Sequence, residues 1–145
     1  HQGLQKWLRD LNHLYRSEPA LFETDCHRDG FAWIDFHDAD NSVISYLRKD
    51  KAGRRILAVV CTYTPVPRLN YRVGVADGGF WEELLNSDAK DYGGSGHGNM
   101  GGVEASPASF YGNFDYTLSV TLPPLGIVVF RKVLDEAAAT DTPTP

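Results

Sequence analysis

The sequence lacks most of the features that mark secreted, membrane and nucleic-acid-binding proteins. It has two cysteines, Cys26 and Cys61, so one disulfide is the most that it can form. Its longest apolar runs, such as residues 56–61, are far shorter than the roughly 18 residues needed to span a bilayer. A net charge of −5 leaves no basic surface for a phosphate backbone. We therefore expect a cytoplasmic protein with reduced cysteines, and with neither a membrane nor a nucleic acid as partner.

Motifs that bind a cofactor or a metal, or supply a nucleophile, are missing as well. Residues 96–101 spell G-x-G-x-x-G, but no strand pattern precedes them and no helix pattern follows, as a dinucleotide site requires. A calcium loop starting at Asp38 would have Val43 in place of its glycine and Lys49 in place of its closing glutamate. The five histidines lack zinc-binding spacing, and no serine has a G-x-S-x-G context. The sequence predicts no metal, no cofactor and no catalytic residue, although a triad assembled in space stays open.

What the sequence does contain is one helical pattern followed by many strand patterns. From Leu4 to Tyr15 the apolar residues have the spacing of an amphipathic helix, which Pro19 ends. Its apolar stripe needs a partner, either a sheet or a part of the protein outside this sequence. About seven strands are predicted after it, at residues 30–36, 42–49, 54–64, 71–75, 80–86, 116–122 and 126–133. Strands without intervening helices favour an all-β fold, an antiparallel β-sandwich.

Glycines and aromatic residues gather in the second half of the chain. Residues 92–104 contain six of the fourteen glycines, which predicts an ordered loop with positive φ angles or close backbone approach. Trp33 and Trp81 lie inside strand patterns, so we expect both in the core. Tyr92, Phe110 and Tyr111 flank this loop and are candidate carbohydrate-binding residues, because exposed rings stack on the apolar faces of sugars. Core packing is the alternative for these three rings.

Several stretches resemble, in order, segments of bacterial glycogen branching enzymes. GLQKWLRDLNHLYRSEPAL resembles the last helix of their (β/α)8 barrel and the segment that leaves it. Four further stretches resemble parts of the β-rich C-terminal domain of the same family: DADNSVISYLRK, YTPVPRLNYRVGV, GFWEELLNSDAKDYGGSGHGN and TLPPLGIVVF. The resemblance extends over residues 3–133, and it is specific because several motifs occur in the same order. It implies a member of the α-amylase superfamily.

The resemblance also implies a division of the chain and a parent reaction. Residues 1–25 would be a helix left over from the barrel with its linker, residues 26–133 the C-terminal β-sandwich, and residues 134–145 a disordered tail. The family cuts an α-1,4-glucan, holds the segment on a carboxylate and transfers it to a 6-hydroxyl as an α-1,6 branch. Its catalytic carboxylates lie on barrel strands that precede His1. We therefore expect a fragment that is inactive alone.

The resemblance further implies two partners, the catalytic barrel and α-glucan. We expect the domain to stabilise the barrel or to guide glucan chains such as glycogen and maltooligosaccharide. One alternative is an autonomous α-glucan-binding module. Another is the terminal domain of a related debranching or trehalose-forming enzyme of the same superfamily. In the isolated chain, the apolar stripe of the first helix is expected to pack on the sandwich or on a second copy.

Overall fold

The chain starts with the predicted amphipathic helix. In the computed structural model, which describes residues 1–135, α1 spans Gln2–Ser17 and ends where Glu18 becomes extended. Pro19 is the first residue of a second, short helix, α2 (Pro19–Phe22). A backbone N–H at this position has no hydrogen-bond partner within the helix, so proline, which lacks the N–H, is tolerated there. The disordered tail was predicted over residues 134–145, and residues 136–145 of it lie outside the described residues. The domain boundaries at residues 25 and 133 stay predictions.

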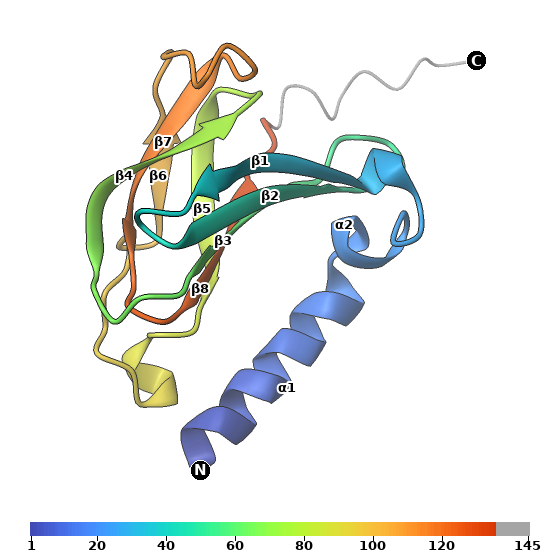
Figure 1. The fold of residues 1–145 in the computed structure, drawn as a ribbon. Helices are drawn as coiled ribbons and strands as arrows, with labels where there is room; N and C mark the ends of the chain where they lie inside the picture. Colours follow the sequence, from blue (N-terminus) through green and yellow to red (C-terminus); the bar gives the residue numbers. More distant parts are fainter. Residues whose placement is uncertain (136–145) are drawn as a thin grey trace.

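Within residues 1–135, eight strands form two antiparallel sheets (Figure 1). The larger sheet has the order β1-β2-β3-β8-β5-β6, and β4 pairs with β7 in the smaller one. The strands are β1 (Phe31–Asp38), β2 (Val43–Lys49), β3 (Ile56–Thr62), β4 (Arg68–Val75), β5 (Gly79–Asn86), β6 (Gly102–Ala105), β7 (Tyr116–Leu122) and β8 (Ile127–Lys132). Two 3₁₀ turns, η1 (Arg28–Gly30) and η2 (Lys90–Tyr92), precede β1 and follow β5. The β-sandwich prediction is confirmed.

The strand that the sequence did not predict is β6. It is four residues long, begins with a glycine and lies at the end of the glycine-rich stretch, so it carries no strand pattern of its own. It pairs with β5 through registers such as Trp81↔Val103. The glycine-rich stretch is therefore a loop that returns the chain to the edge of the larger sheet.

The larger sheet is buried on both faces at its centre. Along β3, Ile56, Ala58 and Val60 belong to the core between the two sheets. Leu57 and Cys61 on the same strand belong to a second core beneath the helices. Successive strand residues point to opposite faces, so a strand covered on both sides needs apolar residues throughout. This explains why every residue of β3 is buried.

α1 lies along the outer face of the larger sheet (Figure 1). The sandwich covers only part of its apolar surface. Trp7 and Leu14 pack against the second core. None of the sixteen residues of α1 is buried, and one side of the helix stays exposed: Leu4, Leu8, Leu11 and Tyr15. The prediction that the stripe packs on the sandwich is thus confirmed for Trp7 and Leu14. None of the helices in residues 1–135 is long and apolar enough to cross a membrane.

The two strand tryptophans differ in burial. Trp81 on β5 is fully buried, and its indole donates a hydrogen bond of 3.2 Å to the carbonyl of Asp77. Trp33 on β1 is 47% exposed, so the prediction that it belongs to the core is wrong. β1 is the edge strand of the larger sheet, and Trp33 shares the face of Tyr46 on β2, which is the face away from the smaller sheet. The helices do not extend far enough to cover it.

The glycine-rich loop is ordered around Asp88. The Asp88 carboxylate accepts hydrogen bonds from the backbone N–H and the hydroxyl of Ser95 and from the backbone N–H of His97. Four glycines of the loop have positive φ angles: Gly93, Gly96, Gly101 and Gly102. At Gly94 a Cβ would lie 2.1 Å from the Asp88 carbonyl oxygen. Both reasons predicted for these glycines are confirmed.

Candidate functional site

Three exposed aromatic rings of β1 and the half-buried ring of Tyr46 on β2 cover the outer face of the larger sheet at its β1 edge. Phe31, Trp33, Phe36 and Tyr46 form this aromatic strip, in which Phe31–Trp33, Phe31–Tyr46 and Trp33–Phe36 ring centres are 5.0, 5.2 and 5.2 Å apart. The sequence already held a signal for it, because Ala32 lies between two rings and faces the core instead. The three rings of β1 present a continuous apolar surface to solvent.

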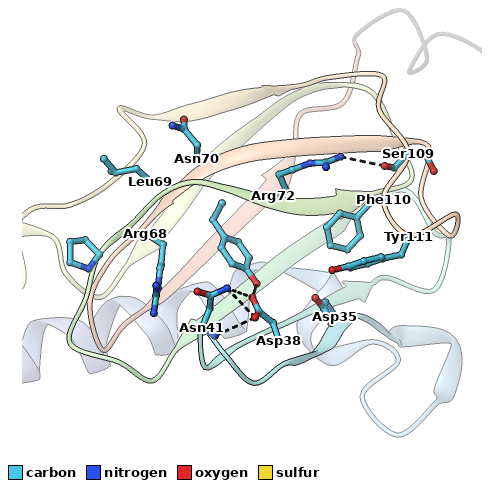
Figure 2. A pocket seen from close by; sticks show the side chains of 12 residues that line it. Asp35, Asp38, Asn41, Arg68, Leu69, Asn70, Arg72, Ser109, Phe110 and Tyr111 are labelled. Atoms are coloured by element: carbon cyan, nitrogen blue, oxygen red, sulfur yellow. Dashed lines mark hydrogen bonds between the residues drawn. The ribbon is translucent and has the colours of Figure 1, made fainter.

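A groove adjoins the aromatic strip. One hollow of about 600 Å³ is lined by Trp33, Phe36 and Tyr111 among others. A second hollow, of about 640 Å³, is lined by Arg68, Arg72 and Tyr111 among others (Figure 2). The two hollows share Asp35, Asp38, Asn41 and Tyr111, and we call them together the groove. It combines exposed rings on β1 with polar side chains from β4 and from the loop before β7.

The Asp38 carboxylate lies at the floor of the groove, where two neighbouring side chains hold it in place as a hydrogen-bond acceptor. The Tyr71 phenol on β4 donates a hydrogen bond of 2.5 Å to its carboxylate. The amide of Asn41 donates to both carboxylate oxygens at 3.0 Å (Figure 2). Burial acts to raise the pKa of Asp38, but the hydrogen bonds from Tyr71 and Asn41 outweigh it and lower that pKa. Burial and then the Asp38 carboxylate raise the pKa of Tyr71. At neutral pH Asp38 is therefore charged and Tyr71 is a proton donor.

The rim of the groove carries strained residues. Tyr111 has a φ of +48° and is 79% exposed. The buried ring of Phe110 packs edge-on against it, with the ring centres 4.6 Å apart. Asn70, on β4, also lines the groove and has a φ of +54°. Left-handed backbone is uncommon for residues other than glycine, and such strain tends to persist where a ligand is held.

The structure brings together two of the three predicted carbohydrate-binding residues. Phe110 and Tyr111 lie at the groove, Phe110 as a buried support and Tyr111 as an exposed ring. Tyr92 lies on η2 against α1, outside the groove, with its ring against Trp7. The sequence missed Phe31, Trp33, Phe36 and Tyr46 as site residues, and of these it had assigned Trp33 to the core.

A serine, a histidine and an aspartate do meet in the glycine-rich loop. The Ser95 hydroxyl lies 2.8 Å from Nδ1 of His97 and donates a hydrogen bond of 2.6 Å to Asp88. Nδ1 of His97 also lies 3.4 Å from the Asp88 carboxylate. In a catalytic triad the serine hydroxyl bonds the histidine alone and the carboxylate bonds the far side of the ring, whereas here the carboxylate accepts directly from the serine hydroxyl and from two backbone N–H groups of the loop. The cluster is therefore a loop-ordering device. Among residues 1–135, no group of three or more His, Cys, Asp or Glu could hold a metal ion.

The groove has the chemistry of a saccharide-binding surface. Flat rings suit the apolar faces of sugars, and the side chains of Asp38, Arg72 and Asn70 offer acceptors and donors for hydroxyl groups. Asp38 is held as a charged acceptor by Tyr71 and Asn41. The arrangement suits the binding of a neutral polyhydroxy ligand.

Comparison with known proteins finds several relatives that share one name. The 1,4-alpha-glucan branching enzyme GlgB of Aquifex aeolicus is 54% identical over 131 residues, which is 90% of this chain and 21% of that protein. The enzyme of the same name from Trichodesmium erythraeum is 50% identical over 131 residues, 90% of this chain and 17% of that protein. That from Aromatoleum aromaticum is 50% identical over 137 residues, 94% of this chain and 21% of that protein.

This chain spans about a fifth of the length of these relatives, and the catalytic domain is not part of it. Residues 33–133 match the family described as the alpha amylase C-terminal all-beta domain. The match runs from the middle of β1 to the residue after β8, and so includes both sheets of the sandwich. The chain belongs to the family of alpha-amylase C-terminal all-beta domains.

Proposed function

We propose that this chain is the C-terminal part of a cytoplasmic 1,4-alpha-glucan branching enzyme, in which it stabilises the catalytic barrel and guides glucan chains. The observation that carries the proposal is identity near 50% over about 90% of the chain to proteins of that name. In such an enzyme, carboxylates elsewhere in the chain cut an α-1,4 bond and form an α-1,6 branch through a covalent intermediate. This part performs no bond-making step.

The exposed side of α1 supports contact with the barrel. Leu4, Leu8, Leu11 and Tyr15 form an apolar row about 15 Å long, from the rise of about 1.5 Å per helical residue. A row of this kind in water is an association surface. The relatives are about five times as long as this chain, so a large upstream part of such an enzyme is available as the occupant.

The groove supports guidance of glucan. Tyr111 and the rings of the aromatic strip flank the Asp38 floor, so one chain of several glucose units can contact rings and hydrogen-bonding groups together. Phe110 keeps the Tyr111 ring in place. Shallow sites of this kind bind weakly, but a weak site beside an active centre raises the local concentration of substrate chains.

Titration with maltoheptaose, followed by amide chemical shifts, tests the groove. We expect millimolar binding with shifts at β1 and around Tyr111. Tyr111→Ala and Trp33→Ala should each weaken it about tenfold, which is about 1.4 kcal/mol and corresponds to the burial of roughly 55 Å² of apolar ring surface at about 25 cal/mol per Å². Tyr63→Ala removes a ring outside the groove whose 60% exposure lies between those of Trp33 and Tyr111, and is the control. Shifts confined to Tyr92 and the glycine-rich loop would contradict the assignment.

Supplying the catalytic barrel of a branching enzyme in trans separates the proposal from its alternatives. We expect no new α-1,6 linkage from maltooligosaccharide with the chain alone, and a higher yield by proton NMR when chain and barrel are mixed. Leu4→Ser/Leu8→Ser should abolish this gain, because both side chains are exposed and belong to the contact surface. Glucan binding without any effect on the barrel would favour an autonomous binding module, and trehalose as product would favour a trehalose-forming relative.

A further inference from the structure

The N-terminal half of α1 is held by the 3₁₀ turn at the start of the glycine-rich loop. The Tyr92 phenol donates a hydrogen bond of 2.6 Å to the carboxylate of Asp10. Its ring meets Trp7 edge-to-face, with the ring centres 5.3 Å apart. The neighbouring Asp91 lies 3.5 Å from the ammonium group of Lys6. One turn of three residues therefore contacts two successive turns of the helix.

The helix approaches this turn so closely that only glycine fits at one position. A Cβ at Gly3 would lie 2.1 Å from the backbone carbonyl oxygen of Tyr92. Glycine lowers the intrinsic stability of a helix relative to alanine, so a close contact is a physical reason for its place near the start of α1. Gly3 and Tyr92 thus fit each other as backbone against backbone.

The segment that carries Tyr92 is itself rigidly built. The backbone N–H of Tyr92 donates to the carbonyl of Ala89, and that of Gly94 donates to the same carbonyl. Asp88, one residue earlier, is hydrogen-bonded to Ser95 and His97 farther along the loop. Tyr92 therefore contacts α1 from a fixed position, because the hydrogen bonds of the glycine-rich loop hold its backbone in place.

The contact fixes the rotation of α1 about its axis. Residues follow each other by about 100° around a helix, which places Leu4, Leu8 and Leu11 roughly a quarter turn from Trp7 and Leu14. The C-terminal end of α1 is tied separately, because buried Glu18 pairs with Arg131 on β8 at 3.1 Å. Two attachments, one at each half of the helix, determine where its exposed apolar side points.

We propose that Tyr92 is a positioning residue that clasps α1 to the sandwich through Asp10 and so sets the direction of the exposed apolar side of the helix. Without the clasp the helix keeps its attachment at Glu18 and its N-terminal half swings away. That the exposed side receives a catalytic barrel rests on the proposed function. The clasp itself is a property of this chain and is tested on this chain.

Amide hydrogen exchange of the isolated chain tests the clasp residue by residue. In Tyr92→Phe the ring stays and the hydrogen bond to Asp10 is lost, so exchange in the first two thirds of α1 should rise about tenfold or more. Asp10→Ala should have the same effect, and Asp10→Asn, which keeps an acceptor oxygen, should recover most of the protection. The Trp7 indole resonance should shift in the same variants.

Tyr71→Phe is the matched control, because it removes another short tyrosine–aspartate hydrogen bond, that to Asp38 on the other side of the larger sheet. It should leave exchange in α1 unchanged. The proposal is overturned if exchange in α1 does not respond to Tyr92→Phe, or if the strands respond as much as the helix. Neither outcome depends on glucan or on a barrel, so the clasp and the proposed function can fail separately.

Discussion

Replacing Trp81 by alanine is expected to lower the free energy of unfolding by about 3–5 kcal/mol, the usual effect of deleting a fully buried large aromatic side chain. Trp81 has no exposed surface, lies in the core between the sheets and bonds the Asp77 carbonyl. The cavity cannot collapse easily, because β5 is hydrogen-bonded to β8 on one side and to β6 on the other, which holds its backbone in place. Urea unfolding followed by far-ultraviolet circular dichroism measures the change.

The same substitution at Trp33 provides the comparison. Trp33 is about half exposed on an edge strand, so its loss should cost about 1 kcal/mol or less. Trp81→Phe should recover much of the stability lost in Trp81→Ala, since it refills most of the volume. Equal losses at Trp33 and Trp81 would mean that the aromatic strip is as deeply packed as the core, against the structure.

The contrast between these two tryptophans shows how far the sequence alone could lead. Alternation along β1 predicts that Trp33 and Ala32 face opposite sides of a sheet, but it does not say which side is covered. Coverage depends on where α1 and α2 end over the larger sheet, a matter of tertiary packing. Trp81 was predicted correctly because both faces of β5 meet other elements.

The candidate site was harder to predict than the fold. Hydrophobic periodicity indicated α1 and seven of the eight strands found within residues 1–135, because each of them carries its own pattern. The groove combines Asp38, Tyr71 and Tyr111, which are far apart in sequence and meet only because the two sheets pack against each other. Tyr92 and Tyr111 are closer in sequence than Asp38 and Tyr71, yet β6 lies between them, and Tyr92 packs against α1 whereas Tyr111 lies at the groove beside Phe110.

The residue that ties α1 to the sandwich at its C-terminal end is Glu18. It is 1% exposed, and its Oε2 lies 3.1 Å from Nη1 of Arg131 and 3.7 Å from Nη1 of Arg55. Arg131 also pairs with Glu82 on β5 through a hydrogen bond of 2.8 Å from its Nε. Oε1 of Glu18 is buried and has no hydrogen-bond partner among the described residues. A buried carboxylate with an unpaired oxygen destabilises the folded state unless its arginine partners stay in place.

Replacing Glu18 by alanine should lower the free energy of unfolding by about 3 kcal/mol, the lower end of the range for breaking a buried ion pair, because Arg131 keeps Glu82 and some contact with water. Glu82→Ala removes the other carboxylate of the same arginine, but this one is about a third exposed and should cost about 1 kcal/mol or less. In 1 M salt the smaller loss should shrink further, while the loss at Glu18 should persist, since salt screens exposed charges more than buried ones. Urea unfolding of both variants at low and high salt makes the comparison. Similar losses for the two carboxylates, with the same salt dependence, would show that burial of Glu18 contributes nothing special to the attachment of the helix.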